Sequence, residues 1–182
     1  MNKKIRWITE TAVLLALLIT LQALTKPAGQ LVTGSCVNVV LAVAVLFGGW
    51  GSGLTVAVLS PILAYLLGIA PNILTVPAIM VGNCVYDLLL HFLADPAGKK
   101  IWKNILAWIL SAGAKFAVLY FIVVKVICGF MAQPLMDAGT LKAPMLQALP
   151  ATFSWPQLFT ALIGGGVALL IAPVLRKALK KG

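Results

Sequence analysis

Six apolar runs, each close to the length needed to cross a lipid bilayer, follow one another along the chain. They cover residues 5–24, 31–47, 51–67, 73–92, 101–126 and 155–175. A helix needs about 20 apolar residues to span a hydrocarbon core of about 30 Å, at a rise of about 1.5 Å per residue. The breaks between most of these runs carry the Gly and Pro residues that are typical of turns. The sequence therefore predicts an all-α integral membrane bundle of six transmembrane helices that forms a single domain over residues 1–182.

The composition excludes a soluble domain. Hydrophobic residues make up 62% of the chain, charged residues 10%, and the mean hydropathy is +1.05, whereas soluble domains carry about 25% charged residues. The net charge of +10 does not indicate nucleic-acid binding, because the cations lie in short clusters between apolar runs. The cysteines Cys36, Cys84 and Cys128 lack metal-ligand spacing. We expect no nucleic-acid partner, no metal, no cofactor and no disulfide.

The positive clusters predict how the bundle is oriented, because Lys and Arg accumulate in the short cytoplasmic connections of membrane proteins. With six spans, one side of the membrane receives Lys3, Lys4, Arg6, Lys99, Lys100, Lys103, Arg176, Lys177, Lys180 and Lys181, and the other receives only Lys26, Lys142 and Lys125. The sequence therefore predicts that both termini are cytoplasmic. We interpret the first run as a membrane span, since about 20 apolar residues is long for the core of a cleaved signal peptide.

The longest connection, residues 128–154, lies on the predicted outer face. It is rich in Pro, Met and Ala. Connections of this length are uncommon in compact domains and are often binding loops or lids. We therefore expect this segment to act as a lid or plug over the outer end of the bundle.

Lys115 is the most informative polar residue inside a predicted span. It lies roughly 20 Å from the cytoplasmic start of the fifth run, at about 1.5 Å per residue, which places it in the outer half of the membrane. Ionisable residues inside a membrane are costly and mark sites by default. We interpret Lys115 as the complement of an anionic ligand group. Pairing with a carbonyl or an acid, or snorkelling to the interface, are the alternatives.

Three further polar residues, Asn83, Asp87 and His91, recur every four residues on one face of the fourth run. Asp87 suits a structural partner or a proton-linked group, and His91 suits the membrane interface. An intramembrane enzyme would need an acid–base constellation, which is not visible, and the chain has no G-x-x-x-x-G-K-[ST] phosphate loop. We therefore expect no enzymatic activity, and any ATP-driven motor would be another chain.

The outward ends of the predicted helices carry polar side chains that could line one cavity. Gln30, Thr33, Ser35 and Asn38 begin the second run, and Asn72 lies in the connection after the third. Together with Lys115 and Asn83 they would supply a few fixed polar groups among apolar walls, which is what a small-molecule site requires. The sequence therefore predicts a substrate-binding cavity at the outer face.

Ala12 and Ala16 lie four residues apart on one face of the first helix, and Thr20 continues the stripe. Small residues at this spacing let another helix approach closely. The stripe could dock a partner subunit, but spacing alone favours packing against a helix of the same chain.

Three local patterns predict contacts of their own. The glycines at 164–166 indicate close helix packing, because glycine in a helix interior is otherwise destabilising. Phe153 and Trp155 suit an aromatic belt at the membrane interface, with stacking on a ligand as the alternative. Arg6 and Glu10, four residues apart, are expected to form an interfacial ion pair.

Several short motifs occur in a recognisable order: QLVTGSCVN from Gln30, FGGWGSG from Phe47, LSP from Leu59, GIAP from Gly68 and GN from Gly82. This order, with the six-span length and the Ala12/Ala16 pair, resembles the substrate-binding S components of energy-coupling-factor (ECF) vitamin transporters. The motifs that carry the resemblance cover the first four runs, and the last two runs resemble the family only in their layout.

The resemblance implies a prokaryotic cell-membrane protein that captures a vitamin or related micronutrient from outside. Its implied partners are a transmembrane coupling subunit and two cytoplasmic ATPase subunits, with Ala12 and Ala16 as the docking residues. It also implies substrate binding toward the outer side, by helices four to six and the outer loops.

Members of the family bind chemically different vitamins. If Lys115 faces the cavity, an anionic vitamin such as pantothenate is the best candidate, with folate or cobalamin next, because an unpaired buried cation is costly. The alternatives to a transporter subunit are a stand-alone permease or channel, which requires a continuous polar path, and a structural membrane protein, which requires no cavity.

Overall fold

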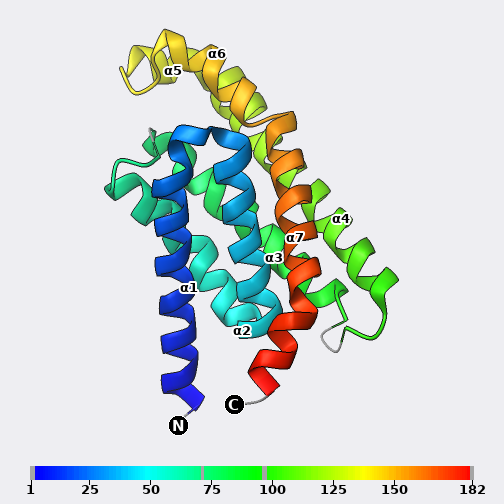
Figure 1. The fold of residues 1–182 in the computed structure, drawn as a ribbon. Coiled ribbons are helices and arrows are strands. Elements are labelled where there is room, and N and C mark those ends of the chain that lie inside the picture. Colours follow the sequence, from blue (N-terminus) through cyan, green and yellow to red (C-terminus); the bar gives the residue numbers. More distant parts are fainter. Residues whose placement is uncertain (1–2, 71, 96–97, 181–182) are drawn as a thin grey trace.

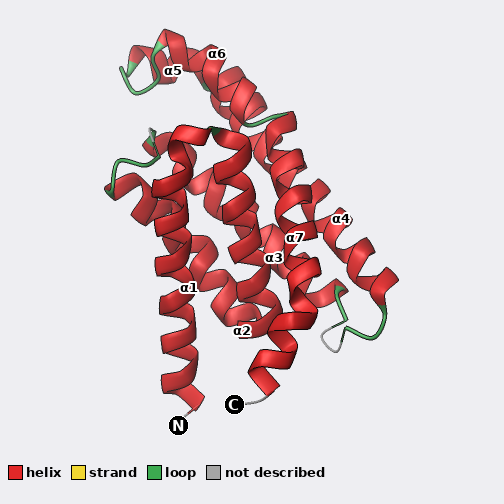
Figure 2. Ribbon diagram, viewed as in Figure 1, coloured by secondary structure: helices red, strands yellow, loops and turns green. Residues whose placement is uncertain are grey.

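The computed structural model describes residues 3–70, 72–95 and 98–180. Within those ranges the chain is helical and contains no strand (Figure 2). The longer elements are α1 (Lys3–Thr25), α2 (Gln30–Leu66), α3 (Val76–Leu93), α4 (Ile101–Leu119), a π-helical continuation of α4 (Tyr120–Phe130), α5 (Ala132–Asp137), α6 (Ala143–Thr152) and α7 (Trp155–Lys180). Short 3-10 turns cover Lys26–Ala28 and Ile73–Thr75. Pro71 of the GIAP motif and Lys181 lie outside the described residues.

Five of the described helical stretches are long and apolar enough to cross a membrane. The chain is thus an all-helical membrane bundle. The predicted run 31–47 and all but the last residue of run 51–67 fall within α2, which is the longest of these helices.

A sharp reversal at Gly49 divides α2 into two segments. Gly49 has φ 78° and ψ 177°, a conformation that only glycine adopts without strain. A Cβ atom added to Gly53 would lie 2.8 Å from the Cβ of Val45, although eight residues of continuous helix would separate these positions by about 12 Å. The two segments therefore fold back on each other, as the FGGWGSG break predicts.

The bundle has two different ends (Figure 1). α1 begins and α7 ends at one end, where the connection from α3 to α4 also lies; we call this the basic end. At the opposite end lie the α1–α2 turn, the α2–α3 connection, α5 and α6; we call this the lid end. Lys26 Nζ donates to Gly68 O at 2.8 Å and ties two of the lid-end turns together.

The packing falls into two apolar clusters. The main core lies where α2 contacts α1, α3 and α7, and where α4 contacts α3 and α7. Its largest fully buried side chains include Leu18, Leu41, Val45, Val56, Tyr86 and Leu90. A second cluster lies at the lid end and joins α6 to the π-helical segment through Val123, Ile127, Leu149 and Phe153.

Close contact between α2 and α7 depends on Gly164. A Cβ atom there would lie 2.5 Å from Asn38 Cβ and 2.6 Å from the carbonyl oxygen of Ser35. A Cβ atom added to its neighbour Gly165 would overlap Trp108 and the Tyr86 hydroxyl oxygen. The prediction that the glycine run serves close helix packing is confirmed.

The segment predicted as a lid is itself helical. Residues 128–154 contain the end of the π-helical segment, α5 and α6. Phe153, which we assigned to an aromatic belt, is 6% exposed and packs in the lid-end cluster, so that assignment is wrong. Trp155 is 62% exposed and stacks on Phe116, with ring centroids 5.5 Å apart.

Candidate substrate-binding cavity

A cavity of about 480 Å³ lies at the lid end, between the α1–α2 turn, α2, α3, α4, α6 and the start of α7. Binding sites for small molecules fall in the range of about 300–1,000 Å³ and combine apolar walls with a few placed polar groups. The apolar part of the lining comprises Val37, Ile69, Ala70, Ile79, Met145, Ala148, Leu149 and Phe153. The size and lining are therefore those of a site for a small organic molecule.

The floor of the cavity is built around Lys115. Lys115 Nζ donates to Asn38 Oδ1 at 2.6 Å and to Asn83 Oδ1 at 2.7 Å, so α4, α2 and α3 meet at this ammonium. The lysine is 3% exposed. An ammonium has three N–H donors, and two of them are engaged by amide oxygens. Among the described residues the third has no hydrogen-bond acceptor, and the centroid of the Tyr86 ring lies 5.5 Å from Nζ.

The side chains of Asn38 and Asn83 are both oriented by hydrogen bonds that their amide nitrogens donate. Asn38 Nδ2 donates to Gly34 O at 2.8 Å and to Thr160 Oγ1 at 3.4 Å. Asn83 Nδ2 donates to Ala57 O at 3.5 Å. Since each amide nitrogen faces an acceptor, each amide oxygen must face Lys115. The helix packing therefore positions the floor before any ligand binds.

The rim of the cavity is polar and is joined to the lid. Asn72 Oδ1 accepts from Leu74 N at 2.9 Å, while Asn72 Nδ2 lies 3.2 Å from Met145 Sδ on α6. Thr33 Oγ1 donates to Thr25 O at 2.8 Å, and Gln30 is exposed. The contact between Asn72 and Met145 links the α2–α3 connection to the lid helix across the cavity.

The six residues predicted to bind substrate all line this one cavity: Gln30, Thr33, Asn38, Asn72, Asn83 and Lys115. Their role in binding stays a prediction. Ser35, which we also placed in the cavity, is not in its lining. Its hydroxyl donates to Leu31 O at 2.6 Å.

The sequence analysis missed other polar lining residues, namely Gln22, Thr75, Thr152 and Gln157. Gln22 and Gln157 lie inside predicted spans, so the criterion that selected Lys115 applies equally to them. Gln22 Oε1 is buried and has no hydrogen-bond partner among the described residues. It is therefore an acceptor available to a ligand.

Asp87 lies one helical turn beyond Asn83 and is not part of the cavity lining. It is fully buried, and within the described ranges neither carboxylate oxygen has a hydrogen-bond partner. The ring of the preceding residue, Tyr86, has its centroid 5.5 Å from Lys115 Nζ. His91 is half-buried and contacts Phe92.

The small-residue stripe on α1 faces away from the bundle. Ala12, Ala16 and Thr20 are all exposed, so the internal packing that spacing alone favoured is wrong. The side of α1 that packs inward carries Thr11, whose hydroxyl donates to Ser52 Oγ at 3.0 Å.

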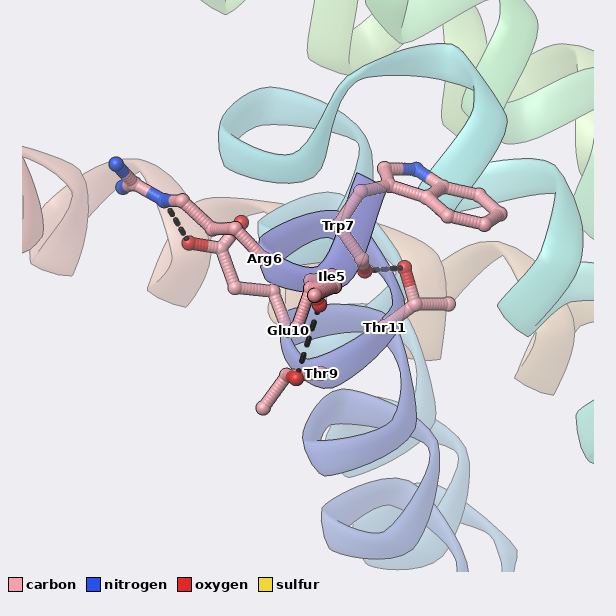
Figure 3. Close-up of polar contacts among 6 residues, drawn as sticks. All are labelled: Ile5, Arg6, Trp7, Thr9, Glu10 and Thr11. Atoms are coloured by element: carbon pink, nitrogen blue, oxygen red, sulfur yellow. Dashed lines mark hydrogen bonds and ion pairs between the residues drawn. The ribbon is translucent and has the colours of Figure 1, made fainter. Parts of the chain in front are cut away.

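The predicted ion pair on α1 is present. Arg6 Nε donates to Glu10 Oε1 at 2.7 Å. Figure 3 shows this pair on one side of α1, while Trp7 and Thr11 point to the other side, toward α2.

The family model described as "ECF transporter, substrate-specific component" matches residues 6–176, which is nearly the whole chain. No curated protein and no solved structure matches the chain.

Proposed function

The chain belongs to the family of ECF transporter substrate-specific components, and from this premise we propose that it captures a vitamin or related micronutrient from outside the cell. It is a multi-pass membrane protein and a transport subunit, not an enzyme. The observation that carries the proposal is the cavity whose floor is built around a buried lysine that is held by two amide oxygens and, among the described residues, forms no ion pair.

In this proposal the chain crosses a prokaryotic cell membrane six times, with α2 contributing two crossings. The distribution of positive charge supports both termini in the cytoplasm. Described cations gather at the basic end: Lys4, Arg6, Lys99, Lys100, Lys103, Arg176 and Lys177. The lid end has only Lys26, Lys125 and Lys142. The cavity then opens to the outside, where the substrate is found.

The polar groups of the cavity favour a ligand that carries an anion and a hydrogen-bond donor. Within the described ranges no ion pair joins Lys115 to an acid, so a ligand carboxylate would supply the missing counter-charge. The unpartnered Gln22 Oε1 would accept from a ligand hydroxyl or amide. Pantothenate has both features, and folate and cobalamin are the next candidates.

Lid helix α6 would close over the bound substrate. It contributes Met145, Ala148 and Leu149 to the cavity wall and is held to the opposite rim by Asn72. Release to the cytoplasm would be driven by ATP hydrolysis in two partner ATPases through a membrane coupling subunit. The exposed Ala12/Ala16 stripe supports α1 as the surface that meets the coupling subunit.

Substitutions on α1 can test partner docking separately from substrate binding. Ala12→Leu/Ala16→Leu is expected to abolish copurification of the coupling subunit and the ATPases, because bulky side chains prevent close helix approach. Substrate binding should be unchanged. Ala117→Leu, at an exposed alanine of α4, is the matched control and should assemble normally. Normal assembly of the double variant would show that α1 docks elsewhere or not at all.

The test of substrate capture is to purify the chain from its native membrane and identify retained small molecules by mass spectrometry, followed by binding of a vitamin panel. A retained vitamin, or saturable binding of one panel member, is the expected result. An empty protein that binds no vitamin, together with ion conductance in vesicles, would refute capture and favour a channel.

A further inference from the structure

A second hollow, of about 300 Å³, lies at the basic end between α1, α2 and α7. It is separate from the substrate cavity, and no lining residue is shared. Most of its wall is apolar: Val13 and Leu14 from α1, Val43 and Phe47 from α2, and Leu175 from α7. We call it the basic-end groove.

One cationic side chain lines this groove and a second lies beside it. Arg6 lines it, and its side chain is 54% exposed. The Nε–H of Arg6 is engaged by Glu10, but the four N–H donors on its two Nη atoms point away from that carboxylate (Figure 3). Arg176 is not in the groove lining, but its Cζ lies 5.9 Å from the centroid of the ring of Phe47, which does line the groove.

The groove's single acidic residue does not cancel this charge. Glu10 is the only acid in the lining, and it is paired with Arg6 at 2.7 Å. Arg176 and the exposed Lys177 then leave the region net positive. A phosphate can accept from guanidinium N–H groups in a bidentate manner, which makes arginine pairs well suited to it.

An apolar trough with one arginine in its wall and a second against its lining residue Phe47 matches a molecule with a long apolar chain and an anionic phosphate at one end. Basic pockets between transmembrane helices on the cytoplasmic side bind the headgroups of acidic lipids. We propose that the basic-end groove binds an acidic glycerophospholipid. Its phosphate lies between Arg6 and Arg176, and one acyl chain lies along Val13, Leu14 and Val43. This inference is independent of which substrate the other cavity takes.

The groove also borders the surface proposed for docking. Val13 lies in the groove wall and next to Ala12 on α1. A helix of a partner subunit is therefore the competing occupant, and the chain is tested in the absence of partner subunits.

The experiment uses the full chain in mixed micelles with equal amounts of phosphatidylglycerol and phosphatidylcholine, and counts bound lipids by native mass spectrometry. The expected result is preferential retention of phosphatidylglycerol. Arg6→Gln/Arg176→Gln should reduce that retention roughly fivefold for each charge removed. Lys99→Gln/Lys103→Gln removes the same charge from exposed positions outside the groove and should retain the lipid normally.

A second variant tests the apolar part without changing charge. Val43→Phe fills the groove and should also reduce phosphatidylglycerol retention, while thermal unfolding confirms that the variant is folded. Inorganic phosphate should not displace the lipid. Equal retention of the two lipids, equal loss in the Lys99/Lys103 control, or full displacement by inorganic phosphate would each overturn the proposal.

Discussion

A lysine buried within a membrane bundle is stable only if its charge is solvated by the protein. Lys115 Nζ donates hydrogen bonds to two amide oxygens, which stabilise the ammonium without neutralising its charge. Asp87, one turn deeper, is the reverse case, because its carboxylate is fully buried and has no hydrogen-bond partner in the described part of the chain. The interior therefore holds one solvated cation and one unsolvated acid, and only the cation lines the cavity.

The role of Lys115 can be measured once a ligand is known. Lys115→Met is expected to weaken binding of an anionic vitamin roughly tenfold to a hundredfold, because a hydrogen bond to a charged group contributes about 1.5–3 kcal/mol. Lys125→Met, which removes an exposed charge beyond α4 that does not line the cavity, should leave the dissociation constant unchanged. Calorimetric titration of both variants gives the comparison. Equal affinity of Lys115→Met and the parent protein would show that the lysine is structural.

The cavity residues could largely be predicted because polar side chains inside a membrane are rare and costly. This criterion selected Asn38, Asn83 and Lys115, which meet on the floor. It failed for Ser35, whose hydroxyl can be satisfied by a carbonyl of its own helix four residues earlier. A serine in a membrane helix is therefore a weaker indicator of a cavity than an asparagine or a lysine.

At the scale of helices, the sequence predicted where the chain turns better than it predicted what the connections contain. The glycines around Gly49 predicted the reversal inside α2, since a positive φ favours glycine. Helices α5 and α6 were not predicted, because they are short and contain Pro134, Pro144 and Pro150. Pro144 lies in the first turn of α6, where a missing N–H costs nothing. The π-helical register of Tyr120–Phe130 depends on packing that the sequence pattern does not show.

The contact between α2 and α7 supplies a test of helix packing. Gly164→Ala would place a methyl group 2.6 Å from the backbone oxygen of Ser35, and a backbone cannot rotate away as a side chain can. We expect a loss of about 1–3 kcal/mol, the usual cost of overpacking, seen as a lower midpoint of thermal unfolding in detergent. Binding should weaken too, because Asn38 lies beside Gly164.

Gly113→Ala is the matched control for that substitution. Gly113 is also inside a long helix, α4, but a Cβ atom there would have no neighbour within 4 Å. Alanine favours helix over glycine by about 1 kcal/mol, so this variant should unfold at an equal or higher temperature. If both variants lost stability equally, the close approach of α2 and α7 would not be the cause.

For the whole molecule, the two ends of the bundle differ in both charge and structure. The basic end holds most described cations and the groove between α1, α2 and α7, whereas the lid end holds the cavity and α6. The start of α1 and the end of α7 lie at the same end of the bundle (Figure 1), as an even number of crossings would require. The order of apolar runs predicts an even number of crossings, because a miscount by one would split the positive clusters.

The orientation itself can be measured by labelling single cysteines in intact cells. After Cys36, Cys84 and Cys128 are replaced by alanine, Asp137→Cys places a thiol on α5 at the lid end, and Lys103→Cys places one on α4 at the basic end; both positions are exposed. A membrane-impermeant maleimide should label the cysteine at position 137 in intact cells, and the cysteine at position 103 only after the membrane is permeabilised. The reverse pattern would place the substrate cavity on the cytoplasmic side. Capture from outside would then be impossible, whatever vitamin the purified protein binds.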